Sequence, residues 1–491
     1  MKHNLLNKAL VLWLLLCLLC PAALAEEAAA ATEPVQLREL ASGLGKLNPI
    51  NKTAYLLAQE PNGENWGMIS TSGKQLIPYH YGSLSYISYD CFLGGLFAPL
   101  KSTKNHPAEP TLEYINSKAL VAWDGTLVTE HLYGDIKVYN HYWAACWILE
   151  EGTEEDNDYK YDKTHFYKIK RCDIYWLGDY CQPGSSKTEK PAWRASLNRS
   201  QFKNAQAHDR YLSVQDREDQ VTMYNFAFQP VSTPGKIGTA AYRVRNYAVV
   251  TPEGSMLMDG YTAVSEANTS QGMLLVATRT DYSGVKWNYL YTLTGNLLLG
   301  PTEYAIKSPT QKYALLSKDN LVGLYSLEEA RFLVPCEFDK IISNGFGMDD
   351  YVMNGFVVVE KDGVRSYYDI AAGAVTETLN SELEKYTAMG SAYSYLDDGE
   401  RYVLVTADSY TKRLTREQSF TAVRGDGYMI PYKQGKYYGL MNWHGAEILP
   451  PQYKNKIVIT DDNHVIIHSP KRGYCLYELV AESATGIPEA E

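Results

Sequence analysis

The sequence lacks a long apolar run in its main part and has no excess of basic residues. After residue 25, no segment approaches the roughly 20 apolar residues that a membrane-spanning helix requires. The chain carries 46 Lys and Arg against 57 Asp and Glu, a formal net charge of −11. Nucleic acids and anionic bilayers repel such a chain unless a local basic patch offsets the balance, and the sequence shows no such patch. We therefore expect no nucleic-acid partner and no membrane span in the mature chain.

Motifs of the common enzyme classes are also missing. The sequence holds no G-x-S-x-G nucleophile elbow, no phosphate-binding loop and no dinucleotide fingerprint. Its only C-x-x-C pair is Cys17 with Cys20, near the amino terminus, so a cysteine zinc site is not expected. The sequence favours a non-catalytic protein without a cofactor or a metal. Two carboxylates brought together only by the fold, as in glycosidases, would leave no such motif.

The amino terminus has the three parts of a secretory signal. Lys2 and Lys8 supply positive charge, residues 9–19 form an unbroken apolar run, and residues 23–25 place small residues before a cleavage site. We predict an exported protein, either extracellular or associated with the cell envelope. The segments expected outside the folded part are a signal peptide at 1–25, a linker at 26–50 and a disordered tail at 481–491.

Six cysteines follow the signal, and an exported chain can join six into as many as three disulfides. They are Cys91, Cys146, Cys172, Cys181, Cys336 and Cys475. Cys172 and Cys181 are the only close pair, and they flank a short Tyr- and Trp-containing segment with the pattern of a hairpin. A disulfide between these two and buried free thiols are both compatible with the sequence. For the other cysteines buried thiols are expected, because Cys behaves as a small hydrophobic residue.

Two segments far apart in the chain share one spacing of signature residues. In both, a second glycine comes six positions after the first, and a tyrosine comes eight positions after the second glycine. The signature positions are Trp66, Gly67, Gly73 and Tyr81 in the first segment, and Tyr438, Gly439, Gly445 and Tyr453 in the second.

Looser copies keep this phase to within about one residue and bring the total to about seven units. The copies are Val322-Gly323 with Ala330 and Phe338, Trp287-Asn288 with Gly295 and Tyr304, Arg365-Ser366 with Gly373, Gly125 with Tyr133, and Gly254 with Tyr261.

Each unit predicts an antiparallel meander of three or four strands. The second glycine lies where two strands meet in a tight turn, a place that often needs positive φ. The proline that follows, Pro78 or Pro450, is expected to close the next strand because it cannot donate to a continuing ladder. Such a meander cannot bury both faces alone, so neighbouring units must stack. We predict an all-β, β-propeller-like ring, since closure protects strand edges, with an open curved array as the alternative.

The pattern Trp66-Gly67-x-Ile69-x-x-x-Gly73-Lys74-x-x-Ile77-Pro78-x-x-Tyr81 resembles the bacterial WG β-repeat. The segments around Asn288, Gly323 and Gly439 resemble degenerate members. Such repeats are found in exported or surface proteins of bacteria, so the resemblance implies a repeat scaffold rather than a known activity. We predict a WG-like domain over residues 51–480.

The regular spacing of the repeat signature is interrupted at about residues 150–209, and we interpret this segment as an insertion projecting from one face. The segment begins with acidic residues, and Asp156 and Asp158 have the alternate spacing of calcium ligands. Lys160 occupies the next alternate position, however, and the Gly-x₅-Glu of an EF-hand loop is absent. A solvated charged loop is the favoured interpretation.

Tyrosine is unusually frequent, with 40 Tyr against 11 Phe and 9 Trp. A tyrosine ring packs on a pleated sheet while its hydroxyl reaches water, so half-buried rings on strands account for most of this excess. Exposed tyrosines would also stack on sugars or pack on a protein partner. Together with the signal and the repeats, this favours an exported binding or scaffold protein whose partner is a cell-envelope glycan or a surface protein. The alternative is a propeller-type enzyme acting on polysaccharide.

Overall fold

The computed structural model describes most of the chain from residue 35 to residue 481. The described ranges are 35–50, 53–61, 63–88, 91–100, 109–181, 188–269, 272–342, 351–352, 355–375, 387–388, 393–397, 401–406, 411–415, 419–420, 429–442, 447–460 and 463–481. The predicted signal peptide, Gly445 and the tail beyond residue 481 lie outside these ranges. Within them the chain forms eleven antiparallel sheets, here numbered 1 to 11 in chain order. The helical elements described are α2 (Leu112–Ile115) and a 3-10 turn at Arg199–Gln201, so the predicted all-β class is confirmed.

Sheets 1 to 4 take up the first half of the described chain. Their strands are β2 (Lys46–Pro49), β3 (Tyr55–Gln59), β4 (Trp66–Ser70) and β5 (Gln75–Tyr81) in sheet 1; β6 (Ser83–Ser88), β7 (Cys91–Gly95) and β8 (Lys118–Ala122) in sheet 2; β9 (Asp135–Val138), β10 (Trp143–Glu151), β11 (Tyr159–Lys160), β12 (Phe166–Trp176) and β13 (Ala192–Asn198) in sheet 3; and β14 (Asn204–His208), β15 (Tyr211–Gln215), β16 (Val221–Tyr224) and β17 (Pro230–Ser232) in sheet 4.

Sheets 5 to 8 continue in the same order. Their strands are β18 (Arg243–Arg245), β19 (Ala248–Val250) and β20 (Met256–Met258) in sheet 5; β21 (Ala263–Thr269), β22 (Gly272–Thr280), β23 (Lys286–Thr292) and β24 (Leu297–Thr302) in sheet 6; β25 (Ala305–Pro309), β26 (Tyr313–Lys318), β27 (Leu321–Ser326) and β28 (Arg331–Phe338) in sheet 7; and β29 (Lys340–Ile342), β30 (Phe356–Lys361), β31 (Val364–Asp369) and β32 (Ala374–Val375) in sheet 8.

Sheets 9 to 11 complete the series, and the last of them also takes in the first strand of the chain. Their strands are β33 (Thr387–Ala388), β34 (Tyr393–Asp397), β35 (Arg401–Thr406) and β36 (Thr411–Thr415) in sheet 9; β37 (Ser419–Phe420), β38 (Met429–Gln434), β39 (Tyr437–Asn442) and β40 (Glu447–Tyr453) in sheet 10; and β41 (Val458–Ile459), β42 (His464–Ser469), β43 (Gly473–Ala481) and β1 (Val35–Leu44) in sheet 11.

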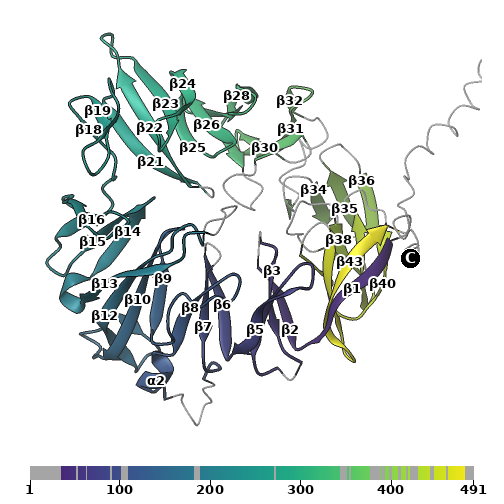
Figure 1. The fold of residues 1–491 in the computed structure, drawn as a ribbon. Coiled ribbons are helices and arrows are strands. Elements are labelled where there is room, and N and C mark those ends of the chain that lie inside the picture. Colours follow the sequence, from purple (N-terminus) through teal and green to yellow (C-terminus); the bar gives the residue numbers. More distant parts are fainter. Residues whose placement is uncertain are drawn as a thin grey trace, which may run out of the picture.

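The chain closes on itself through β1. This strand pairs antiparallel with β43, so the described amino-terminal strand completes the last sheet (Figure 1). Leu37 lies opposite Leu479, and Arg38 forms an ion pair with Glu478. The linker predicted at residues 26–50 is therefore wrong for its second half, because β1 and β2 occupy it. A strand that pairs with the far end of the sequence leaves no local signature.

The hydrophobic core is a series of clusters between neighbouring sheets. One cluster joins sheets 1 and 2, another joins sheets 2 and 3, and a third joins sheets 3 and 4. The series continues across the ends of the chain, because Ile466 and Leu476 of sheet 11 pack with Leu47 and Leu56 of sheet 1. Together with the β1 pairing, this gives a β-propeller-like arrangement of small sheets, as predicted. The eleven sheets outnumber the seven units seen in sequence, because sheets such as sheet 4 carry none of the signature residues.

The signature residues mark turns and close approaches in the sheets. Gly73, between β4 and β5, has φ +80°, and Gly295 has φ +86° in the equivalent turn of sheet 6. Ala330, which replaces this glycine in sheet 7, also has positive φ, at +52°. The turn thus imposes its left-handed conformation even where the residue is not glycine.

In three of the sheets, the backbone of the next strand passes very close to the first glycine of the signature. A Cβ atom on Gly67 would lie 2.5 Å from the carbonyl oxygen of Ile77 in the next strand. Gly439 and Gly323 face the same obstacle, 2.7 Å from the carbonyl oxygens of Leu449 and Val334 respectively. In these three sheets a side chain at this position would collide with the backbone of the next strand.

The following strand is irregular where it crosses the first glycine. Trp66 pairs with Tyr81 while Met68 pairs with Ile77, so β5 contains extra residues at this point. Pro78 lies inside β5 at the irregularity. The expectation that this proline closes its strand is wrong, because edge strands and bulges both tolerate a residue that cannot donate.

Residues 150–209 do not form a projecting insertion. They supply the end of β10 and all of β11, β12, β13 and β14, so they build much of sheet 3 and begin sheet 4. β12 pairs with β10 from Trp176 back to Tyr167. The repeat signature is absent here, and for that reason the sequence pattern missed these sheets.

Candidate functional site

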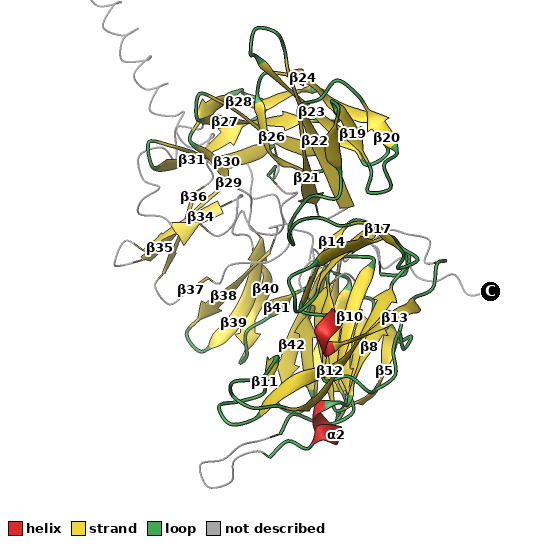
Figure 2. Ribbon diagram, turned by 90° about the vertical axis from the view of Figure 1, so that its left-hand side faces the viewer, coloured by secondary structure: helices red, strands yellow, loops and turns green. Residues whose placement is uncertain are grey.

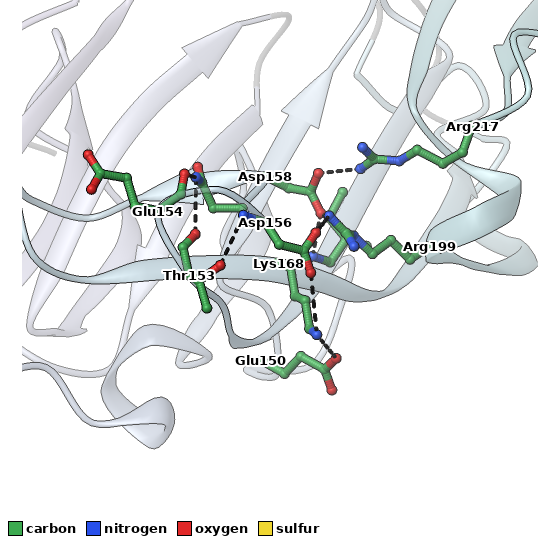
Figure 3. Close-up of polar contacts among 10 residues, drawn as sticks. Glu150, Thr153, Glu154, Asp156, Asp158, Lys168, Arg199 and Arg217 are labelled. Atoms are coloured by element: carbon green, nitrogen blue, oxygen red, sulfur yellow. Dashed lines mark hydrogen bonds and ion pairs between the residues drawn. The ribbon is translucent and has the colours of Figure 1, made fainter.

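The acidic segment that resembled a calcium loop is held in ion pairs at one end of sheet 3 (Figure 3). The Asp156 carboxylate lies 2.5 Å from the Arg199 guanidinium and 3.7 Å from the Lys168 ammonium. Lys168 also lies 3.7 Å from the carboxylate of Glu150. The acids that suggested calcium ligands are therefore neutralised by basic side chains of the same region.

Asp158 is the most buried member of this group, with a side chain that is 9% exposed. Its carboxylate accepts hydrogen bonds from the Ile169 amide and from Nε of Arg199, both at 2.9 Å, and it pairs with Arg217. Burial alone would raise the pKa of Asp158, but these bonds outweigh it and leave the pKa below its usual value. Asp158 thus fastens the β11 region to the 3-10 turn and to sheet 4.

A cluster of aromatic rings surrounds the short helix α2, which lies at the outer margin of the molecule (Figures 1 and 2). We define the α2 aromatic cluster as Phe97, Tyr114, Tyr159 and Tyr161. The rings of Phe97 and Tyr114 are stacked with centroids 6.0 Å apart, and Tyr161 meets Tyr114 edge-on at 6.2 Å. Phe97 is 42% exposed, and the three tyrosines are half-buried. This arrangement leaves aromatic faces within reach of solvent.

The helix positions Tyr114 through its cap. Thr111 precedes α2, and its side-chain oxygen accepts a hydrogen bond from the Tyr114 amide at 3.1 Å. The Tyr114 hydroxyl in turn accepts a hydrogen bond from the Leu100 amide at 3.2 Å. Burial, and a hydrogen bond with Tyr114, raise the pKa of Tyr161 to about 12. The rings of Tyr114 and Tyr161 are therefore held by backbone and hydroxyl contacts.

Two charged residues lie next to the cluster, where β8 and β9 begin. Lys118 Nζ donates to the carbonyl oxygen of Gly134 at 2.6 Å and lies 5.5 Å from the ring centre of Tyr159. Burial lowers the pKa of Lys118, and the Asp135 carboxylate partly opposes that effect. Burial raises the pKa of Asp135, and Lys118 partly opposes it. Groups whose pKa values are shifted by burial and by a charged neighbour concentrate at functional sites and also occur in structural ion pairs.

A second polar group links sheets 4 and 6. His208 Nδ1 lies 2.7 Å from Glu266 Oε2, and Glu266 Oε1 accepts hydrogen bonds from the amides of Ala241 at 2.6 Å and Tyr242 at 3.2 Å. Burial raises the pKa of Asp209, and the Glu266 carboxylate adds to that rise. Two acids and a histidine do converge here. The His208 and Glu266 side chains are 2% and 9% exposed, which suits a structural link, whereas Asp209 is half-buried.

The sequence did not indicate either of these groups. Lys118 and Asp135 belong to different strands, β8 and β9, and His208 and Glu266 are 58 positions apart. The abundance of tyrosine was the one signal that pointed to the α2 aromatic cluster. In the part of the chain that the structure describes, no group of three or more His, Cys, Asp and Glu residues is placed to hold a metal ion. The described residues also contain no helix long and apolar enough to cross a membrane.

The predicted disulfide partners lie on different faces of sheet 3. Cys172 packs in the cluster between sheets 3 and 4, whereas Cys181 packs in the cluster between sheets 2 and 3. A bond between Cys172 and Cys181 would have to pass through the sheet, so that pairing is wrong. Trp287, another signature residue, donates from Nε1 to Asp281 at 3.1 Å and supports its hairpin.

Comparison with known proteins gives structural likenesses at low scores. No family model and no curated protein matches the chain. The computationally designed Ika8 protein matches 57% of this chain and 97% of its own, at 12% identity and a TM-score of 0.20. A eukaryotic initiation factor matches 86% and 91% respectively, at 9% identity and a TM-score of 0.31. The AfRom2 CNH domain matches 63% and 91% respectively, at 10% identity and a TM-score of 0.19.

Proposed function

We propose that the protein is a non-catalytic, exported binding or scaffold protein, built from WG-like repeats, that holds a cell-envelope glycan or a surface protein at the α2 aromatic cluster. The observation that carries this proposal is the set of fixed, partly exposed rings beside Lys118 and Asp135. Aromatic faces stack on the apolar faces of sugars and on partner side chains, while a few charged groups orient the ligand. The predicted signal peptide supports a location where such ligands occur.

The net charge of the chain limits the classes of ligand that it is expected to bind. A net charge of −11 disfavours polyanionic ligands, so neutral or basic glycans and basic protein surfaces suit it best. The scaffold itself supports the role, because small stacked sheets hold the loops that carry Phe97 and Tyr161 in fixed positions.

Binding to purified envelope glycans and envelope proteins tests the proposal. We expect Tyr161→Ala to weaken binding roughly five- to thirtyfold, because the loss of one stacked ring costs on the order of 1–2 kcal/mol. The exposed Tyr282→Ala, in the hairpin loop of sheet 6, is the matched control and should leave binding unchanged. The measurement is a titration of each variant against the bound glycan or protein.

The rival function is hydrolysis of a polysaccharide at the group formed by His208, Asp209 and Glu266. A screen of the purified protein for release of sugars from envelope polysaccharides separates the two. Turnover that is lost in Glu266→Gln, with no stable complex, would replace the binding proposal by the enzymatic one.

A further inference from the structure

Two cysteines far apart in sequence meet between sheets 2 and 3. Cys91 begins β7, and Cys181 lies in the turn that follows β12; the two are separated by 90 positions. Their Sγ atoms are 2.7 Å apart, and both side chains are completely buried. We propose that Cys91 and Cys181 form a disulfide that ties sheet 2 to sheet 3.

The surroundings single out this pair among the described cysteines. Cys172 faces the other side of sheet 3, and Cys336 in sheet 7 donates to the carbonyl oxygen of Leu316 at 3.2 Å. Cys146 is buried in the same cluster as Cys91 and Cys181, but the sulfur contact in this cluster joins Cys91 to Cys181. Cys91 and Cys181 are therefore the partners that the packing brings into sulfur contact.

The bond forms by thiol–disulfide exchange. One thiolate attacks an external disulfide, such as oxidised glutathione or a disulfide oxidoreductase, and displaces one thiol. The second cysteine then attacks the mixed disulfide, forms the bond between Cys91 and Cys181, and displaces the second thiol. The two cysteines lose two protons and two electrons, and the external disulfide is reduced to two thiols. Because both side chains are buried in the folded protein, exchange takes place before sheets 2 and 3 have packed.

The bond would stabilise the first part of the ring. It closes a loop of 90 positions, which restricts the unfolded chain more strongly than a short loop does. It also requires an oxidising compartment, in agreement with the predicted signal peptide. Once formed, it is shielded from reductants by the cluster between sheets 2 and 3.

Peptide mapping without reduction tests the proposal. The protein is folded in a mixture of oxidised and reduced glutathione, its free thiols are alkylated, and the digest is analysed by mass spectrometry. We expect a peptide pair that joins Cys91 to Cys181, with Cys146 and Cys172 alkylated only after denaturation. Alkylation of Cys91 and Cys181 as free thiols on denaturation, or a bond from either one to another cysteine, would overturn the proposal.

Variants add a second measurement. Cys91→Ser should remove the linked peptide pair and lower the melting temperature by about 5 °C, with no further decrease on addition of reductant. Cys146→Ser lies in the same cluster and should keep the linked pair. If Cys91→Ser does not fold, the peptide map of the unaltered chain still decides the question.

Discussion

Replacing Gly67 by alanine is expected to lower the free energy of unfolding by about 3 kcal/mol. The new Cβ would lie 2.5 Å from the carbonyl oxygen of Ile77 and 2.9 Å from the ring of Tyr79. The backbone oxygen cannot move without disturbing the pairing of β4 with β5, so the strands must separate. Denaturant titration of the two proteins measures the difference.

A matched control separates this clash from a general effect of adding a methyl group. Gly235 has no atom within 4 Å of its would-be Cβ, so Gly235→Ala should change stability by less than about 1 kcal/mol. Gly439→Ala, which meets the carbonyl oxygen of Leu449 at 2.7 Å, should resemble Gly67→Ala. Equal, small effects for all three variants would show that the signature glycine has no special role.

The second large effect is expected for Asp158→Asn, which should reduce stability by about 2–3 kcal/mol. The change removes the charge that Arg199 and Arg217 face, and it puts an amide where the carboxylate accepts three donors. Glu154→Gln removes the same charge from an exposed position of the same loop, and we expect it to be nearly neutral. Thermal and denaturant unfolding of both variants provide the comparison.

The pH dependence gives an independent measure of Asp158. Its pKa in the folded protein lies below the usual value of 3.8, so its contribution is present above about pH 4 and is lost as pH falls through the folded pKa. The unaltered protein should therefore lose more stability than Asp158→Asn between about pH 5 and pH 2. Parallel stability curves for the two proteins would contradict this role.

The fold class could be predicted because its evidence is local. Each signature, such as Gly67, Gly73 and Tyr81, lies within a single meander, so its spacing reports the turn and the crossing of that meander. Pro78 lies inside β5 instead of closing it, because β5 is an edge strand with an irregular register and both conditions accept proline inside a strand.

The features that could not be predicted from the sequence depend on contacts between residues that are distant in sequence. The pairing of β1 with β43, the contact of Cys91 with Cys181 and the link from His208 to Glu266 each join segments that carry no shared pattern. Sheets 3 and 4 lack the signature, so their strands are not recognisable as repeats in the sequence and resemble a single insertion. Of the candidate site, the sequence showed only the abundance of tyrosine; the positions of Lys118 and Asp135 follow from how β8 and β9 begin.

Cross-linking of β1 to β43 tests whether the series of meanders closes through the first strand. Arg38→Cys with Glu478→Cys places two thiols at directly opposed positions of β1 and β43. We expect an intramolecular disulfide, identified by peptide mapping, between positions 38 and 478. The neighbouring pair Arg38→Cys with Tyr477→Cys, which points to opposite faces, should give none. Absence of the 38–478 bond in the folded, oxidised protein would show that β1 does not complete the last sheet.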